Sequence, residues 1–323
     1  MNKKYLKIKF VDFWSDFNPH DNFIVDALSE HYGLTYDDNP DYLFFSCFGA
    51  SHLSYNCVKI LFVGENIVPD FNLCDYAIGF DYLTFGDRYL RLPLYTTYPD
   101  FKKLERDKVI NEQLITSRKF CSIVVSNASN ADPTRKEFFT LLSRYKQVDS
   151  GGRAWNNIGG PIDNKIEFLS HYKFNIAFEN SSVKGYTTEK IMESMSAGSI
   201  PIYWGNPLVG RDFNERSFVN VHAYASMKEV VEYIIHLDSS DEDYLAMMRQ
   251  PWLPEQNYSD WKERLSSFLK GIIEKPIPEA KYIPAYGGSY VYIRQLKRMH
   301  AINSFIKPYA HTYGMIKKWF KDW

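Results

Sequence analysis

Short apolar runs that end at polar, Gly or Pro residues recur along the first hundred residues of the chain. Their length and partly alternating pattern are typical of β-strands. Between the first two runs, the apolar spacing of NFIVDALSEHYG and its trailing Gly33 indicate a helix that ends at a glycine. The predicted strands are residues 4–11, 41–48, 58–63, 75–79 and 89–94.

Strand-like and helix-like segments alternate more regularly in the second half. Strands separated by helices form parallel sheets with helices on both faces. We therefore expect an α/β protein with two Rossmann-like, doubly wound domains that face one another across a cleft. The strands expected in this half are 119–126, 173–178, 200–204 and 217–221, and the helices are 133–145, 163–171, 187–197 and 226–236.

A change in composition marks the expected domain boundary. After Pro99, the run FKKLERDKVINEQLITSRK is charged and helix-prone, and we place the connection near residues 100–117. A length of 323 residues also favours two domains. The predicted division is 1–110, 111–255 and a C-terminal part, 256–323, made of helices and a tail that could return to the first domain.

Composition and charge limit the class of protein. Hydrophobic residues make up 45% and charged residues 24%, the balance of a globular enzyme. A net charge of -1 gives no overall attraction to nucleic acid, and we expect no nucleic-acid partner. The four cysteines lack CxxC spacing and lie mostly in apolar runs, which indicates buried free thiols.

The two ends of the sequence bear on localisation. The N-terminus passes directly into a strand and lacks the apolar core of a signal peptide. Residues 290–323 carry seven Lys or Arg residues against a single acid, Asp322, interleaved with apolar side chains. Such a basic tail can lie on an anionic membrane, and a solvated helix packed on the body is an equal alternative. We expect a cytoplasmic protein, with peripheral contact to the inner face of the membrane through this tail.

The segment 173–205, KFNIAFENSSVKGYTTEKIMESMSAGSIPIYWG, carries the most specific chemical information. It predicts a strand that ends at Glu179 and Asn180, a polar loop, and a helix that begins near Thr187. A helix N-terminus after such a loop suits phosphate. Lys190 in the first turn opposes the helix dipole unless an anion compensates it. Neither GxGxxG nor GxxxxGKS is present, which argues against dinucleotide oxidoreductases and P-loop NTPases.

This segment closely resembles the signature of the α-1,3-fucosyltransferase family (fucosyltransferase family 10), commonly written around FxFEN, Y-x-TEK and AG-x-x-PIYWG. Residues 62–95 resemble the bacterial, Helicobacter-type branch, and SNASNADPTRKEFF at 126–139 is a third match. The resemblance spans roughly residues 1–260. It implies a GT-B fold with an N-terminal acceptor-binding domain and a C-terminal GDP-fucose-binding domain.

The resemblance also implies a reaction. It is the inverting transfer of L-fucose from GDP-β-L-fucose to O3 of N-acetylglucosamine in an N-acetyllactosamine-type acceptor, which gives Lewis X-type glycans of bacterial surface polysaccharide. Inversion needs a base on one side of the sugar and cations on the other. Glu65, directly after the strand KILFVG, matches the family's base, and Arg135 and Lys190 match its phosphate contacts.

Three further residues are expected at the donor site. Glu189 matches a family glutamate near the donor, where it could bind ribose or fucose hydroxyls or stabilise positive charge on the sugar. Asn180 and Tyr186 are expected to complete the donor pocket, ahead of Glu179, which could be a structural cap. No metal is expected to be essential, because the acidic run at 238–243 indicates a solvated helix cap.

Several alternatives stay open at the level of sequence. Glu65 could cap a segment or pair with a surface cation, and Lys190 could be solvated. Trp14, Phe17 and His20 could line the acceptor cleft or pack in the core. The chain could use another nucleotide sugar or acceptor, with α-1,4 linkage included, or could be a non-catalytic glycan-binding protein. It lacks the leucine-containing heptad repeats of its relatives, and dimerisation through such repeats is not expected.

Overall fold

Two compact α/β units make up the protein. The computed structural model describes residues 3–126, 131–254 and 261–319. Unit 1 combines the chain up to Gly79, residues Leu83–Leu90 and the chain from Lys262 onward. Unit 2 comprises Phe80–Tyr82 and Arg91–Trp261, and is therefore inserted within the sequence of unit 1.

Unit 1 is built on a six-stranded sheet with the order β2-β1-β3-β4-β5-β6. The pairs from β2 to β5 are parallel. Strands β3 and β4 are buried along their whole length, as expected for inner strands of a sheet that is covered on both faces. The strands are β1 (Tyr5–Val11), β2 (Gly33–Tyr36), β3 (Tyr42–Phe45), β4 (Val58–Phe62), β5 (Tyr76–Gly79) and β6 (Tyr89–Arg91).

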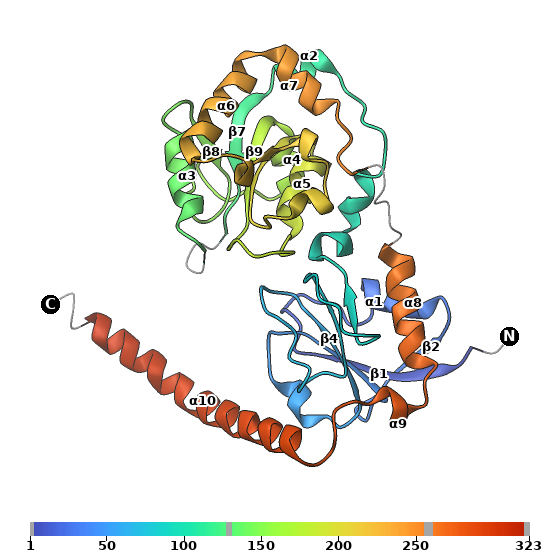
Figure 1. Ribbon diagram of the computed structural model, residues 1–323. Helices are drawn as coiled ribbons and strands as arrows, with labels where there is room; N and C mark the ends of the chain where they lie inside the picture. The colour runs from blue at the N-terminus through green and yellow to red at the C-terminus, as the bar shows by residue number, and fades with distance from the viewer. Residues whose placement is uncertain (1–2, 127–130, 255–260, 320–323) are drawn as a thin grey trace. The chain divides into compact units, whose positions relative to one another are not determined.

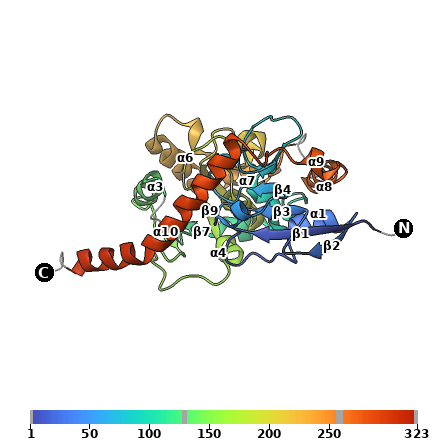
Figure 2. The same ribbon diagram turned by 90° about the horizontal axis from the view of Figure 1, so that it is seen from below.

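The helices of unit 1 come from both ends of its sequence. Asn22 caps α1 by accepting hydrogen bonds from the N–H groups of Ile24 and Val25. Glu30, which follows α1, pairs with Lys262 of α8. Figure 1 and Figure 2 both show α10 as a long rod whose C-terminal half lies away from the sheet of its own unit. The helices are α1 (Phe23–Ser29), α8 (Trp261–Ile273), α9 (Ile277–Ala280) and α10 (Gly288–Trp319).

A buried carboxylate fixes the returning C-terminal segment on the sheet of unit 1. Asp75, just before β5, is fully buried. It accepts hydrogen bonds from the N–H of Lys59 at 2.8 Å and from the N–H groups of Tyr282 and Ile283 at 2.6 and 2.8 Å. Since buried N–H groups need partners, one side chain satisfies three backbone donors from distant parts of the chain.

Unit 2 is built on a five-stranded sheet with the order β11-β10-β9-β7-β8, in which every pair is parallel. All seven residues of β9 are buried, which explains its nearly continuous apolar sequence. The strands are β7 (Lys119–Ile123), β8 (Val148–Ser150), β9 (Tyr172–Phe178), β10 (Ile200–Trp204) and β11 (Val219–Asn220).

Helices cover both faces of this second sheet. Figure 1 shows α3 and α6 on one face and α4 and α5 on the other, the arrangement of a doubly wound sheet. The predicted α/β class with parallel sheets is confirmed. The helices are α2 (Glu112–Thr116), α3 (Thr134–Leu142), α4 (Lys165–Ser170), α5 (Glu189–Ser196), α6 (Met227–Ser239) and α7 (Asp241–Met248). Short 3-10 turns occupy Ser51–Ser54, Leu94–Thr97, Pro99–Lys103, Val209–Arg211, Glu215–Ser217 and Val221–Ala223.

The chain enters unit 2 earlier than the boundary expected near residue 110. Tyr95, Phe101 and Leu104 are buried in the core of unit 2, while the charged residues between them are largely exposed. The charged run is therefore the outer face of an amphipathic segment and not a linker. Two short edge strands, β2 and β8, were not predicted because three or four residues give too little pattern.

Replacing Asp75 with alanine should destabilise unit 1. The substitution removes the acceptor of three N–H groups, of which those of Lys59 and Ile283 are buried, and one unsatisfied buried group costs about 1–3 kcal/mol. We expect urea unfolding followed by circular dichroism to show a loss of about 3 kcal/mol or more. Asp38→Ala is the control, because this carboxylate is 92% exposed and its ion pair is with Lys9. Equal unfolding midpoints for the two variants would contradict the role given to Asp75.

Candidate functional site

The strand order of unit 2 reverses between β7 and β9, since β8 lies beyond β7 and β10 and β11 lie beyond β9. Open α/β sheets bind ligands outside the carboxyl ends of their strands at such a point. Arg135, Lys165 and Lys190 line one small hollow there, together with Val125 after β7 and Phe178 at the end of β9. We call this the cation hollow.

Glu179, the residue after β9, is the fully buried centre of the site. Its carboxylate accepts hydrogen bonds from the N–H and hydroxyl of Thr188, both at 2.7 Å, and from the Lys190 ammonium at 3.0 Å. The Thr188 N–H is one of the free donors at the N-terminus of α5, where a carboxylate is favoured by the helix dipole. Glu179 is therefore the structural cap that the sequence left open.

Lys190 is not solvated, because Glu179 and the Thr188 hydroxyl hold its ammonium. The compensating anion expected from its position on the helix is thus partly supplied by the protein itself. Burial opposes the charge on Lys190, but the carboxylates of Glu179 and Glu189 outweigh burial and raise its pKa. Lys190 is therefore a fixed positive charge at any physiological pH.

Glu189 lies between two cations. The nearer oxygen of its carboxylate is 3.5 Å from the Lys190 ammonium and 3.9 Å from that of Lys165. Burial would raise the pKa of Glu189, but Lys190 and Lys165 overcome this effect and lower the pKa to about 2. An ionised Glu189 can only accept hydrogen bonds, as a contact to sugar hydroxyls requires.

Arg135 connects the end of β9 to α3. One guanidinium nitrogen donates to the carbonyl of Phe178 and to the side-chain oxygen of Asn180, both at 2.7 Å. The Nε of Arg135 is buried, and no described residue accepts a hydrogen bond from it. The structure therefore brings together four residues expected at the donor site, namely Arg135, Asn180, Glu189 and Lys190.

Asn206 shapes the loop between β9 and α5, and the sequence patterns did not identify it. This fully buried residue accepts a hydrogen bond from the N–H of Gly185 at 2.8 Å and donates to the Thr187 hydroxyl at 3.1 Å. Gly185 has a φ of +85°, and a Cβ there would lie 2.6 Å from the carbonyl oxygen of Phe80. Tyr186, expected at the donor site, is itself buried with its ring edge-on to Phe80.

Lys165 was also missed, because it comes from a helix outside the recognised motif. It begins α4, which Asn164 caps, and its ammonium pairs with Glu193 of α5. A lysine at a helix start is usually solvated, so no pattern in the sequence distinguishes it. Residues 127–130 of the third motif lie outside the described part of the chain.

Glu65 lies in unit 1, three residues after β4 ends at Phe62. It is exposed, and its carboxylate has no hydrogen bond or ion pair with the described residues, so the alternative of a surface ion pair does not hold within the described part of the chain. Trp14 and Phe17 belong to a partly buried aromatic cluster, with their ring centroids 5.1 Å apart, whereas His20 is exposed. Trp14 and Phe17 thus pack among other rings without being fully buried, and the core interpretation fails for His20.

The acidic run at 238–243 is only in part the solvated helix cap that the sequence predicts, because the Asp238 side chain is 4% exposed and pairs with Lys146 and Lys173. The Ser240 side chain accepts a hydrogen bond from the N–H of Asp243, and the following acids occupy the first turn of α7. Within the residues that the structure describes, no three His, Cys, Asp or Glu side chains are placed to hold a metal ion.

Two family models match the chain. The model for the α-(1,3)-fucosyltransferase FucT N-terminal domain matches residues 8–98, and that for the glycosyltransferase family 10 (fucosyltransferase) C-terminal part matches residues 115–269. The α-(1,3)-fucosyltransferase FucT of Helicobacter pylori is 38% identical over 285 residues, which cover 75% of this chain. The chain spans only 59% of that relative's length.

Solved structures agree with these matches. A crystal structure of an α1,3-fucosyltransferase with GDP-fucose has a TM-score of 0.74 and 32% identity, and the match covers 85% of this chain and 92% of that one. The structure described as containing GDP has the same TM-score, with 33% identity over 87% and 94% of the two chains. A more distant relative, GDP-fucose protein O-fucosyltransferase 3 of Gallus gallus, is 27% identical over 61% of this chain and 41% of its own.

Replacing Lys165 with methionine should raise the pKa of Glu189. Because the folded pKa of about 2 lies below the ordinary 4.5, this carboxylate stabilises the fold above pH 4.5 and loses its effect as the pH falls through 2. Without Lys165 that loss begins at higher pH. A carboxyl-carbon NMR titration and acid unfolding should both shift upward. Lys228→Met, whose ammonium is on an exposed side chain paired with Glu232, should shift neither.

Proposed function

Because the chain belongs to glycosyltransferase family 10, the fucosyltransferases, we propose that it transfers L-fucose from GDP-fucose to a glycan acceptor. The observation that carries this proposal is the cation hollow at the strand-order reversal of unit 2. Three cations from three helices meet there, and the buried Arg135 Nε has no acceptor among the described residues. A phosphate oxygen of a diphosphate would supply one, since the hollow itself has a volume of only about 10 Å³.

The proposed reaction proceeds with inversion in one displacement. The O3 hydroxyl of an N-acetylglucosamine residue attacks the anomeric carbon of β-linked fucose from the side opposite to the diphosphate. The new O3–C1 bond forms as the C1–phosphate oxygen bond breaks, and GDP leaves. Glu65 takes the O3 proton, a role that suits its carboxylate, which is exposed and has no partner among the described residues.

The departing diphosphate gains negative charge, which Arg135, Lys190 and Lys165 would stabilise. Fixed cations that need no rearrangement are effective at this task. Lys190 is held by Glu179 before any ligand binds. Glu189, ionised at neutral pH, would accept hydrogen bonds from donor hydroxyls or stabilise positive charge on the sugar ring, with Asn180 and Tyr186 completing the pocket.

The proposed acceptor is galactosylated N-acetylglucosamine, which yields Lewis X-type glycans of a bacterial surface polysaccharide. The proposed linkage follows the H. pylori relative, whose name states α-(1,3), and the proposed acceptor follows the resemblance of the sequence motifs. A different nucleotide sugar is the rival, and competition for the site separates the two. GDP should displace a bound donor analogue, whereas UDP and ADP should not.

We also propose that α10 contacts the membrane surface. Its residues up to 306 include the exposed Tyr290, Met299 and Phe305, together with Arg294 and Lys297. Exposed apolar and basic side chains on one helix suit an anionic lipid surface. Among the described residues no helix is both long and apolar enough to cross a membrane. Residues 320–323 of the predicted tail lie outside the described part of the chain.

The first test is turnover of GDP-fucose and N-acetyllactosamine in the presence of EDTA. We expect the α-1,3-linked trisaccharide and GDP to form in the chelator. Glu65→Gln should lower kcat by about 10²-fold or more, because general-base catalysis contributes on that scale. Lys190→Ala should lose a comparable factor through weaker stabilisation of the diphosphate.

Each outcome of this assay has a distinct meaning. If GDP binds but no trisaccharide forms, the proposed acceptor is wrong. If GDP does not bind, the proposed donor fails as well. Full activity of Glu65→Gln would remove Glu65 as the base. Lys228→Ala serves as the surface-lysine control and should keep wild-type activity.

Removing the basic charges of α10 should weaken vesicle binding. Each Lys or Arg near an anionic surface contributes about 1 kcal/mol, so the triple change Arg294→Gln, Lys297→Gln and Arg298→Gln should reduce partitioning roughly 100-fold. Sedimentation with phosphatidylglycerol vesicles measures this, and phosphatidylcholine vesicles are the neutral control. Unchanged sedimentation of the triple variant would show that α10 is a solvated helix.

A further inference from the structure

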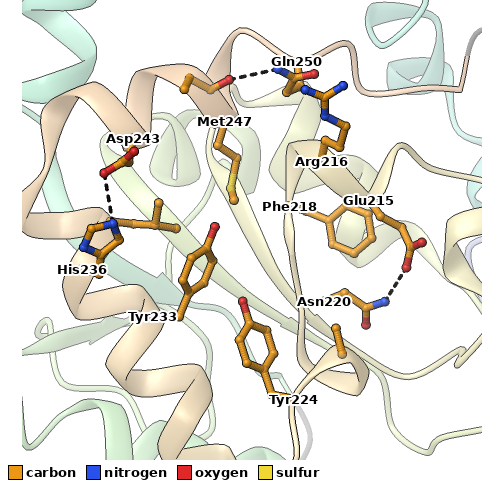
Figure 3. Close-up of a pocket in the computed structure, with 13 residues that line it drawn as sticks. Glu215, Arg216, Phe218, Asn220, Tyr224, Tyr233, His236, Asp243, Met247 and Gln250 are labelled. Carbon is orange, nitrogen blue, oxygen red and sulfur yellow. Dashed lines mark hydrogen bonds and ion pairs between the residues drawn. The ribbon is translucent and has the colours of Figure 1, made fainter.

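A second hollow in unit 2 lies between the edge strand β11 and helices α6 and α7. Its volume is about 570 Å³, and none of its lining residues belongs to the cation hollow. Figure 3 shows side chains from three elements around one space, with Tyr233 and His236 from α6, Asp243 and Met247 from α7, and Asn220 from β11. The donor reaction proposed above uses none of these residues.

Two tyrosines form the wall of this second hollow. The ring centroids of Tyr224 and Tyr233 are 5.6 Å apart with an interplanar angle of 36°, and Figure 3 shows their hydroxyls pointing the same way. Burial raises the pKa of Tyr224 to about 12 and raises that of Tyr233, which keeps both hydroxyls protonated. Neither hydroxyl has a hydrogen-bond partner among the described residues, so each can donate to and accept from a ligand.

The charges around the hollow do not favour a charged ligand. Arg216 provides one exposed guanidinium, whereas Glu215 and Asp243 provide two carboxylates. Glu215 accepts a hydrogen bond from the Asn220 amide at 2.8 Å, and Asp243 pairs with His236 at 3.0 Å. A phosphate would meet more negative than positive charge. An entirely apolar ligand would leave the two phenols and Arg216 without partners.

A neutral sugar meets both requirements. Its C–H faces pack on aromatic rings, and its hydroxyls bond to phenols, amides and a guanidinium. We propose that this hollow binds a neutral oligosaccharide, with a sugar ring against Tyr224 and Tyr233 and its hydroxyls bonded to those phenols and to Arg216. In a transferase, the second hollow would hold a part of the acceptor glycan that is not being modified. This role rests on the proposed function.

Binding is tested on the full chain without donor, using a trimer of N-acetyllactosamine as the probe. With ring-labelled tyrosine, the trimer should shift the NMR signals of Tyr224 and Tyr233, assigned by single substitutions. The double variant Tyr224→Ala, Tyr233→Ala should weaken trimer binding by at least about tenfold. Arg216→Gln should weaken it as well. Tyr286→Ala is the matched control, because this tyrosine is 84% exposed and lies in unit 1.

The fold of each variant is checked through its affinity for GDP, which the separate cation hollow should leave unchanged. Wild-type binding by the double variant, or no shift of the two tyrosine signals at millimolar trimer, would overturn the proposal. If fucose transfer to the disaccharide occurs while these tests fail, the second hollow is rejected and the proposed function stands. If no transfer occurs but trimer binding depends on both tyrosines, the second hollow is an oligosaccharide site and the proposed function is rejected.

Discussion

The site in unit 2 depends on one buried carboxylate. Glu179 has no access to water, so its charge is tolerable only because three donors surround it. Those donors fix the end of β9, the start of α5 and the Lys190 ammonium relative to one another. A Cβ on Gly205, the residue after β10, would lie 2.4 Å from the Glu179 side chain. This position beside Glu179 therefore requires a glycine. Much of the recognised motif thus builds the support for one carboxylate.

This arrangement separates support from contact with a ligand. Glu179 and Asn206 are fully buried and bonded within the protein, whereas Lys190 and Glu189 keep about a fifth of their side-chain surface exposed. The exposed pair is therefore positioned before a ligand arrives, and binding does not have to order it. Preorganised charge of this kind is most effective where charge develops during a reaction.

The sequence predicted the family, the class of fold and most of the longer elements. Its success came from the short, mostly apolar runs of strands such as β4 and β9 and from the motif around Tyr186 and Lys190. The family inferred from that motif is confirmed. The structure decides the role of Glu179 as a buried cap, which the sequence could not do, because a glutamate that caps a helix and one that contacts a ligand look the same in a sequence.

Other features depend on distant contacts that no local pattern records. Lys165 joins the cation hollow only because α4 packs beside α5. Asp75 binds residues more than two hundred positions away, and the early entry into unit 2 follows from burial of Tyr95 and Phe101. Tertiary packing decides these three features, because the local sequence around each of them is compatible with more than one structure.

The clamp at Asp75 has a consequence for synthesis of the protein. Unit 2 is nearly continuous from Arg91 to Trp261, so all of its residues are synthesised before α9 is made. Unit 1 instead waits for Tyr282 and Ile283, whose N–H groups complete the bonds to Asp75. Domains generally fold as units during translation. The inserted unit is thus able to fold first, while the strands of unit 1 made before it remain incomplete until Tyr282 and Ile283 have emerged.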